Sequence, residues 1–590
     1  MRILLVAINA KYIHSNLAVY SLRAYAKEHL REENIEIEIA EYTINQQQDD
    51  ILRDIYEHNA HMVCFSCYIW NLSYVEMLAG ELGKICPQTT LWLGGPEVSY
   101  DAPDVLLRLQ TVKGVMKGEG ECTFAELCRC YAKVSDLCLQ SECEIDRRLC
   151  DIAGITFREC DGTIRENPWR EPVSLSEVPF VYGDMKDFEH KIIYYETSRG
   201  CPFSCSYCLS SIDKRLRFRD IDLVKKELKF FLDQKVPQVK FVDRTFNCKH
   251  EHAMAIWTYI AENDNGVTNF HFEISADLLN EEELNLLETM RPGLVQLEIG
   301  VQSTNDKTIR EIRRTMDFER LSRTVKRIEG MKNIHQHLDL IAGLPFEDIE
   351  SFAASFDDVY ALKPHQLQLG FLKVLKGSYM EEKKEDYRLV YKSTPPYEVL
   401  FTKWLPYADV LKLKGVEEMV EVYYNSRQFE HTLNELEKEY PSAYLMYEKL
   451  WDYYKTHGLH DIQHKRSARY EILLDFVRED ERLGKRAEYY RELLIYDYYL
   501  RENAKTRPVF AEENPLGKEE ARRFYEEEAK EYTYLKGYEG YDKNQLRKMT
   551  HLERFLYLKK TVLFDYMHRN PVNQEAKSYN VDTFFIAKQR

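Results

Sequence analysis

The chain has 590 residues, of which 44% are hydrophobic and 30% are charged, with only 24 Gly and 18 Pro. At roughly 100 to 200 residues per domain, this length predicts several folded domains and excludes a disordered or collagen-like polymer. The formal net charge of −17 argues against a general binder of nucleic acid or anionic membrane, which needs an excess of Lys and Arg. The apolar runs are too short for a membrane span or a signal peptide, so we expect a cytoplasmic protein.

In residues 1–130, short apolar runs alternate with stretches of helical periodicity. This alternation predicts a Rossmann-like, doubly wound parallel sheet, in which ligands bind beyond the carboxyl ends of the strands. No G-x-G-x-x-G follows the first run, so a dinucleotide fingerprint is not supported. The predicted strands are 2–9, 35–41, 61–66, 90–94 and 114–117, and the loops at their ends include Asn9–Asn16, Ser66–Asn71, Gly94–Glu97 and Gly118–Glu121.

Two further segments have a different pattern. Residues 131–185 are predicted to form a connector with a hairpin, 155–158 and 163–166, around Asp161-Gly162. Residues 386–590 are helical in pattern and hold 25 of the 41 tyrosines. These tyrosines are compatible with a stacking surface for a base or aromatic substrate, but we favour core and interface positions with a solvated hydroxyl.

Residues 186–385 contain six strand-like runs, each followed by a helical pattern. Six such units predict a partial (β/α)6 barrel, and the active sites of β/α barrels lie at the carboxyl ends of the strands. The predicted strands are 192–198, 239–243, 270–275, 295–301, 338–342 and 366–372. The fold class expected for the whole chain is therefore α/β, with a mainly α-helical C-terminal region.

The fourteen cysteines are unevenly distributed along the chain. The last is Cys248, and the 342 residues after it contain none. At the end of the first barrel strand, Cys201, Cys205 and Cys208 lie within eight residues of one another. Structural zinc sites prefer four ligands, usually in two separated pairs, whereas three cysteines can hold a [4Fe-4S] cluster with one iron left open. The seven cysteines between residues 122 and 160 are irregularly spaced, so we favour inert thiols there over an auxiliary cluster.

The C-x-x-x-C-x-x-C loop, with Tyr207 before its last cysteine, resembles that of the radical S-adenosylmethionine (SAM) superfamily. The resemblance continues along the barrel through VDRTF at 242–246, EIGVQS at 298–303 and DLIAGLP at 339–345. It implies that the three cysteines bind a [4Fe-4S] cluster. It also implies SAM contacts from Tyr207, Asp243, Glu273, Glu298, Gln302, Arg313 or Arg314, Asp339 and Ile341. The usual Gly-Gly-Glu of the second strand is replaced here.

The N-terminal segment is similar to the cobalamin-binding domain that precedes this barrel in one branch of the superfamily. The similarity is in GGPE at 94–97 and KGEGE at 117–121, and it implies cobalamin contacts from Ser66, Gly94, Gly95 and Glu119. The D-x-H-x-x-G motif that supplies a lower cobalt ligand in corrinoid mutases is absent from the sequence, so we expect no histidine beneath the cobalt. The resemblance covers about two-thirds of the chain, and the helical end is similar to an uncharacterised extension of this branch.

This resemblance implies a radical enzyme that methylates an unactivated carbon of a small-molecule or peptide substrate through a 5′-deoxyadenosyl radical and methylcobalamin. It implies an electron donor such as flavodoxin or ferredoxin. Cyclisation or rearrangement without methyl transfer is the first alternative, and a non-catalytic regulator that binds a corrinoid or a cluster is the second. A methylthiotransferase fits poorly, because the chain lacks that family's N-terminal cysteines and its small β domain.

Methyl transfer sets a geometric requirement, because the two cofactor rims must face each other across one cavity. We therefore expect the loops Ser66–Asn71 and Gly94–Glu97 to face Tyr207 and Gln302. We also expect the C-terminal region to close one side of that cavity and to contact the substrate.

Overall fold

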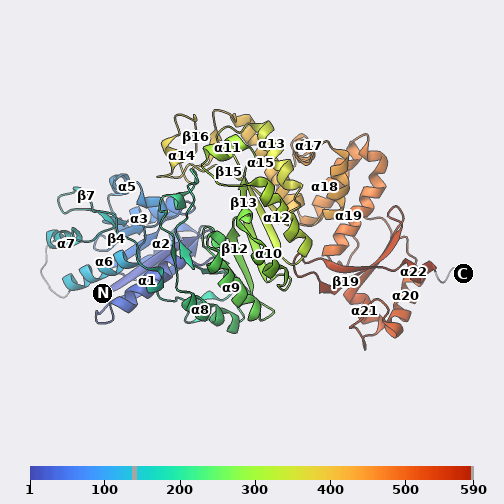
Figure 1. Cartoon of the computed structure of the whole chain (residues 1–590), viewed down its shortest axis with the longest axis horizontal. Helices are drawn as coiled ribbons and strands as arrows, with labels where there is room; N and C mark the ends of the chain where they lie inside the picture. The colour runs from blue at the N-terminus through green and yellow to red at the C-terminus, as the bar shows by residue number, and fades with distance from the viewer. Residues whose placement is uncertain (136–141, 587–590) are drawn as a thin grey trace.

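The computed structural model describes residues 1–135 and 142–586. Its three parts follow one another along the longest axis of the molecule (Figure 1). The N-terminal sheet lies at one end, the barrel strands in the middle, and the last helices and strands at the other end. The loops between the first two parts therefore determine where the candidate site lies.

The N-terminal part is built on the predicted parallel sheet, with strand order β2-β1-β3-β4-β5. Its centre is apolar on both faces, as β1 shows with seven of eight residues buried, because helices cover both sides. The strands are β1 (Arg2–Asn9), β2 (Glu36–Thr43), β3 (Met62–Ser66), β4 (Thr90–Gly94) and β5 (Gly114–Met116). The helices are α1 (Leu17–His29), α2 (Gln48–Glu57), α3 (Leu72–Ile85), α4 (Pro96–Ser99), α5 (Ala102–Arg108), α6 (Glu121–Ser135) and α7 (Glu142–Leu149).

The predicted hairpin forms, but it belongs to the N-terminal sheet. Its strands β6 (Ile155–Arg158) and β7 (Ile164–Glu166) pair antiparallel with each other, and β6 pairs antiparallel with β5. The hairpin therefore extends the sheet to seven strands. Residues 167–192, which follow it, contain only short 3-10 helices and lead to the barrel.

The middle part is an open barrel of six parallel strands, in the order β8-β11-β12-β13-β14-β15. Outward residues of β13 such as Leu297 and Ile299 are fully buried under helices, while Glu298 points to the polar interior. The strands are β8 (Ile193–Tyr195), β11 (Gln238–Phe241), β12 (Asn269–Ile274), β13 (Val295–Gln302), β14 (His335–Ala342) and β15 (Gln366–Phe371). The helices are α8 (Ile221–Asp233), α9 (His250–Glu262), α10 (Glu281–Glu288), α11 (Asp306–Glu311), α12 (Phe318–Met331) and α13 (Ile349–Tyr360).

Residues 372–405, which we call the strap, follow the last barrel strand and pack against both earlier parts. The strap contains α14 (Tyr379–Glu382) and the two-stranded β16 (Val390–Tyr391) and β17 (Val399–Phe401). Its apolar residues share one buried cluster with Ile312 and Leu344 of the barrel. Towards the N-terminal part, the Tyr397 hydroxyl donates a hydrogen bond of 2.6 Å to Glu97, and Lys376 pairs with Asp101 at 2.8 Å. The strap thus touches both domains that flank the candidate site.

The C-terminal region is mainly helical, as predicted, but its three-stranded antiparallel sheet β18-β19-β20 was not predicted. Many of its tyrosines lie in the core, among them Tyr447 and Tyr470, which are fully buried. Core positions are therefore confirmed for these two tyrosines, but their side chains are fully buried, so the hydroxyls are not solvated as predicted. The helices are α15 (Tyr407–Met419), α16 (Glu430–Leu436), α17 (Ala443–Thr456), α18 (Arg466–Glu479), α19 (Ala487–Arg501), α20 (Lys518–Glu531), α21 (Lys543–Met549) and α22 (Asp582–Ile586), and the strands are β18 (Thr550–Phe555), β19 (Lys560–Arg569) and β20 (Ala576–Asn580).

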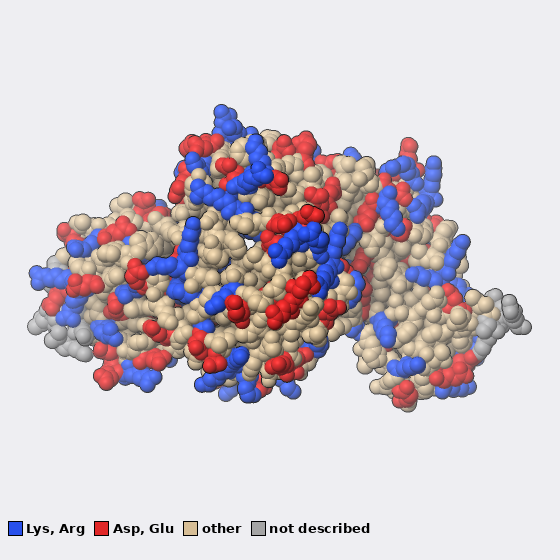
Figure 2. All heavy atoms as spheres, in the orientation of Figure 1, with Lys and Arg blue, Asp and Glu red and all other residues tan. Residues whose placement is uncertain are grey.

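The surface carries charges of both signs. On the face drawn in Figure 2, Lys and Arg are interspersed with Asp and Glu over all three parts. Within residues 1–135 and 142–586, no helix is long and apolar enough to span a bilayer.

Candidate functional site

One cavity of about 1200 Å³ lies between the N-terminal sheet and the barrel. The N-terminal part contributes loops at the carboxyl ends of its strands, including Ser66, Gly94 and Gly95. The barrel contributes the start of the cysteine loop, with Arg199 and Gly200, as well as residues of β8, β11 and β12. The expectation that the two rims share one cavity is therefore confirmed.

Two details of the expected geometry are not found. Tyr207 and Gln302 are not among the residues that line this cavity; Tyr207 lies within the cysteine loop, and Gln302 is the last residue of β13. None of the lining residues comes from the described part of the C-terminal region. Residues 169–173, between the hairpin and the barrel, form that wall instead, so the prediction that the C-terminal region closes the cavity was wrong.

The cysteine loop lies between the two strands of a short ribbon that follows β8. The strands β9 (Ser198–Arg199) and β10 (Arg217–Phe218) pair antiparallel and close the loop at its base. Gly200 has φ 93°, and a Cβ atom there would lie 2.5 Å from the carbonyl oxygen of Arg215. Only glycine fits at this position, because both the backbone angle and the contact exclude a side chain.

The three thiols lie near one another without crowding around a single point. Burial raises the pKa of the Cys201 thiol, and the neighbouring Cys208 and Cys205 raise it further. Among the described residues, the only group of at least three potential ligands that all lie within 4.8 Å of one another is Glu298, His337 and Asp339. One tetrahedral metal ion with bonds of about 2.3 Å would hold its thiolates closer than that. The spacing therefore suits a cluster better than a single ion.

Arg314 joins the cysteine loop to β13. Its Nη1 atom lies 3.9 Å from Cys205 Sγ and 3.3 Å from the Tyr207 hydroxyl, and Nη2 donates to the carbonyl oxygen of Gly300. The Nε atom of Arg314 and the Oε1 atom of Gln302 are buried and have no hydrogen-bond partner among the described residues. Buried polar atoms are normally paired, so these two fit a bound ligand with polar groups.

Arg313 points elsewhere, because its guanidinium lies 3.5 Å from the centre of the Tyr379 ring in the strap. Of the two arginines that the sequence offered, Arg314 is the one at the cysteine loop. Ile341 on β14 is partly buried and packs in the same apolar cluster as Tyr207. It thus presents an apolar side chain beside the cysteine loop, and its contact with adenine stays a prediction.

Glu298 and Asp339 project from adjacent strands into the barrel interior. Glu298 accepts hydrogen bonds from Lys240 at 3.0 Å and His271 at 2.9 Å. Although burial works in the opposite direction, these partners lower the pKa of Glu298 to about 2. Asp339 lies 3.0 Å from His337 Nε2. Glu298 is therefore already paired within the barrel. Asp339 lies nearer than Glu298 to the carboxyl ends of the strands.

Glu273 is the last but one residue of β12 and lines the cavity. Burial raises its pKa to about 7, and the negative charges of Glu298 and Asp339 act in the same direction. A carboxyl group that titrates near neutral pH inside a cavity is typical of a functional site. Of the acidic residues predicted to contact SAM, it is the one exposed to this space.

Asp243 is placed differently from the expectation. It is fully buried, and it accepts hydrogen bonds from the Thr197 amide at 3.0 Å, the Thr197 hydroxyl at 2.7 Å and the Ser198 hydroxyl at 2.6 Å. Burial raises its pKa to about 6. The carboxylate thus holds the link between β8 and β9 in place and does not line the cavity. Its neighbour Arg244, for which no role was predicted, lines the cavity instead.

The predicted N-terminal residues lie around the cavity. The Ser66 hydroxyl accepts a hydrogen bond of 3.1 Å from Asn16. Gly95 has φ 113°, and a Cβ atom there would lie 2.4 Å from the carbonyl oxygen of Cys67. Glycine is therefore needed at this position because the backbones of Gly95 and Cys67 lie close together, and not because a ligand approaches. An aromatic pair that the sequence analysis missed, Tyr68 and Trp70, also lines the cavity, with ring centres 4.4 Å apart.

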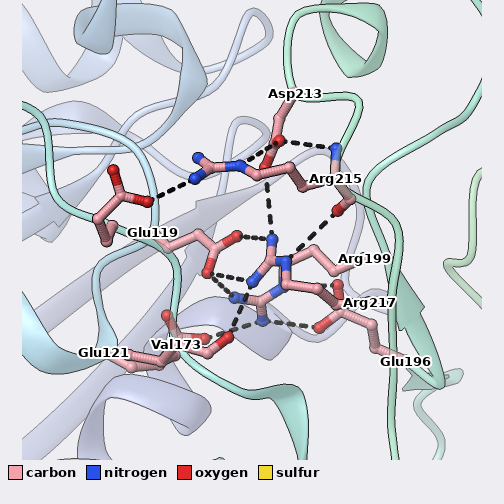
Figure 3. A network of polar contacts seen from close by, with 9 residues as sticks. Glu119, Glu121, Val173, Glu196, Arg199, Asp213, Arg215 and Arg217 are labelled. Carbon is pink, nitrogen blue, oxygen red and sulfur yellow. Dashed lines mark hydrogen bonds and ion pairs between the residues drawn. The ribbon is translucent and has the colours of Figure 1, made fainter.

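Glu119 lines the cavity but is also ion-paired with the barrel, as Figure 3 shows. It binds Arg217 through two hydrogen bonds and lies 3.2 Å from Arg199. Its neighbour Glu121 pairs with Arg199 at 2.9 Å. The sequence marks Arg199 only by its place before Gly200, and nothing in it links these arginines to Glu119.

The cysteines between residues 122 and 160 give no additional metal site among those described. Cys128 is fully buried in the main core, and burial raises its pKa well above the ordinary value. Cys138 and the side chain of Cys143 lie outside the described residues.

Three family models match successive parts of the chain. Residues 3–128 match the B12 binding domain, residues 195–359 match the radical SAM superfamily, and residues 385–575 match DUF4080, a family described as a protein of unknown function. The chain therefore contains a B12-binding domain followed by a radical SAM domain.

Individual relatives are similar over parts of the chain. The cobalamin-dependent radical SAM methyltransferase TokK of Streptomyces tokunonensis is 24% identical over 56% of this chain and 49% of its own length. The anaerobic magnesium-protoporphyrin IX monomethyl ester cyclase of Synechocystis is 24% identical over 47% of this chain and 53% of its own. The chain covers 35% to 53% of the length of four such relatives. The solved structure of the enzyme OxsB with aqua-cobalamin shares the fold, with a TM-score of 0.57, 14% identity, and coverage of 84% of this chain and 80% of that one.

Proposed function

We propose that this protein is a cobalamin-dependent radical SAM enzyme that methylates an unactivated carbon of a small-molecule or peptide substrate. The observation that carries the proposal is the single cavity lined by both domains. A methyl group can pass to a substrate only if its donor and the radical source open onto the same space. The similarity to TokK supports the same reaction class.

In this proposal, the cysteine loop holds the iron–sulfur cluster. Cys201, Cys205 and Cys208 are the ligands, and Arg314 and Gln302 offer their unpaired atoms to the methionine end of SAM. An arginine can bind a carboxylate through paired hydrogen bonds. In the same proposal, Asp339 and Glu273 contact the ribose and the ammonium group, and Ile341 contacts the adenine. Asp243 has no contact role, because its carboxylate is already paired.

The cobalamin is expected on the N-terminal rim. Ser66, Gly94 and Gly95 form its edge, and the aromatic pair Tyr68 and Trp70 offers a flat apolar surface to the macrocycle. The bound cofactors would supply the radical that removes a hydrogen atom and the methyl group that replaces it. The protein positions them and excludes water. The electrons would come from a reductant such as flavodoxin or ferredoxin.

Two alternatives remain. Cyclisation or rearrangement without methyl transfer is supported by the similarity to the Synechocystis cyclase. A non-catalytic regulator would use the same domains without turnover. The Glu273 carboxyl and the unpaired atoms of Gln302 and Arg314 favour an enzyme, because a pure sensor does not need to hold SAM beside an open iron.

The test is anaerobic reconstitution of the full chain with iron, sulfide and hydroxocobalamin, followed by incubation with methyl-labelled SAM and a cell extract. We expect 5′-deoxyadenosine, together with label in a product that is soluble or peptidic. Formation of 5′-deoxyadenosine without transferred label would support cyclisation or rearrangement. Binding of both cofactors without any 5′-deoxyadenosine would support the regulator.

A further inference from the structure

The ribbon that closes the cysteine loop places two positive charges side by side. Arg199 on β9 stands directly opposite Arg217 on β10. Like charges directly opposite each other on paired strands are destabilising. The ribbon therefore needs an anion between the two guanidinium groups.

The B12-binding domain provides that anion. Glu119, in the loop between β5 and α6, accepts hydrogen bonds from both terminal nitrogens of Arg217, one of them at 3.0 Å. The same carboxylate lies 3.2 Å from Arg199 Nη1 (Figure 3). The three side chains retain only 19% to 23% of their exposure, so solvent screens this contact less than a surface ion pair.

The two arginines also have partners within the barrel. Arg199 also binds Glu196 at 2.7 Å, and Arg217 lies 3.5 Å from Asp213 and donates a hydrogen bond of 2.9 Å to the carbonyl oxygen of Val173. Both of these carboxylates belong to the barrel and would stay if the domains separated. From the B12-binding domain, Glu119 pairs with both arginines, whereas Glu121 pairs only with Arg199.

We propose that Glu119 is a positioning residue that couples docking of the B12-binding domain to the shape of the cysteine loop. When the domains are docked, its carboxylate relieves the repulsion between Arg199 and Arg217. When they separate, the base of the loop loses that bridge. The coupling is reciprocal, so order in either loop favours order in the other. The role of this coupling in catalysis rests on the proposed function. In that function, the coupling holds the two cofactor rims in one arrangement.

The test compares full-length Glu119→Gln with a matched control, Glu126→Gln. Glu126 pairs with Arg170 on the same side of the cavity, but that pair does not reach the barrel. Amide hydrogen exchange is measured in segments 118–121 and 198–218. We expect exchange about tenfold faster or more in both segments of Glu119→Gln, as follows from losing a hydrogen bond to a charged group. Faster exchange confined to 118–121, or no change, would overturn the proposal.

A charge swap gives a second test. In the double variant Glu119→Arg/Arg217→Glu, one carboxylate again stands between two guanidinium groups. We expect it to recover the exchange protection that Glu119→Gln lacks. If Glu119→Gln does not fold, the double variant becomes the deciding test. The proposal requires the double variant to fold and to show the exchange protection of the wild type. If it does not fold, or folds without that protection, the proposal is contradicted.

Cofactor binding separates this inference from the proposed function. Hydroxocobalamin titrated into the reconstituted protein should bind about tenfold more weakly to Glu119→Gln than to Glu126→Gln, and the reduced cluster should show a broadened electron paramagnetic resonance spectrum. If the wild type binds neither cofactor, the proposed function fails, while the exchange data still test the coupling. If both variants match the wild type in exchange and in binding, only this inference is lost.

Discussion

The cysteine loop and the C-terminal region place their unpaired buried polar atoms in different surroundings. Around the loop, Gln302 Oε1 and Arg314 Nε have no partner among the described residues, and Arg314 also contacts Cys205. In the C-terminal region, unpaired atoms such as the Tyr490 hydroxyl belong to rings buried in a continuous apolar core. The comparison favours a ligand site around the loop and a structural role for the C-terminal tyrosines. Substitutions in the first should change binding, and substitutions in the second should change stability.

The largest effect is expected from replacing all three loop cysteines. The triple variant Cys201→Ala/Cys205→Ala/Cys208→Ala should lose the four irons of a [4Fe-4S] cluster after anaerobic reconstitution. Its melting temperature without cofactor should stay close to that of the wild type. Cys86→Ala, a free cysteine at the end of α3, is the control and should keep all the iron. Four irons per chain in the triple variant would disprove the ligand assignment.

The opposite result is expected in the C-terminal core. Tyr447→Ala should lower the free energy of unfolding by about 3–5 kcal/mol, because a fully buried ring is removed. Tyr447→Phe keeps the ring and should cost about 1 kcal/mol or less. Denaturant unfolding measures both, and iron content per folded chain should not change. A loss of iron without a loss of stability would contradict the comparison.

Arg314 should affect ligand binding more than stability. Arg314→Gln should weaken SAM binding to the reconstituted protein about 10- to 100-fold, as expected for the loss of a charge-assisted hydrogen bond. Arg313→Gln is the matched neighbour, and its side chain packs on Tyr379. Isothermal titration would compare the two. Equal weakening by both variants would show that Arg314 has no special role.

Glu273 should make stability depend on pH. Burial raises its pKa to about 7, so the folded state binds a proton that the unfolded state releases at lower pH. Stability from this group is present below pH 4.5 and is lost as the pH rises to about 7. Relative to the wild type, Glu273→Gln should therefore become more stable with rising pH, by up to about 1.4 kcal/mol per pH unit. Parallel stability curves for the two proteins would refute this.

The smallest effect is expected where the strap meets the N-terminal domain. Tyr397→Phe removes the hydrogen bond to Glu97 and should cost about 1 kcal/mol of stability. Tyr391→Phe, on the neighbouring strand β16, should cost less. Neither change should alter iron content or SAM affinity. A large loss of SAM binding in Tyr397→Phe would show that the strap acts on the site.

The sequence predicted the strands that carry the site, because parallel strands buried on both faces appear as continuous apolar runs. The β1 and β4 boundaries, Arg2–Asn9 and Thr90–Gly94, match the structure. The sheet β18-β19-β20 was missed, because its strands follow a long helical pattern and only β19 has an extended apolar run.

The polar contacts of the site were harder to predict. Motif positions located the cysteine loop, Glu273 and Ile341, since each is fixed by its place at a strand end. They could not show that the Asp243 carboxylate is already bound by Thr197 and Ser198. They also could not show that Glu119 meets Arg217, 98 residues away along the chain. Side-chain direction and contacts between domains depend on packing that a single sequence does not reveal.

The strap limits how the protein can be divided. A cut at residue 385, where the DUF4080 match begins, would remove Tyr387, Leu389 and Val399 from the apolar cluster that they share with Leu344 of the barrel. The barrel would then expose this apolar surface next to Tyr207. The N-terminal domain would lose Tyr397, the partner of Glu97. The first 385 residues are therefore not an independent unit, and the region of unknown function supplies part of the wall behind the cysteine loop.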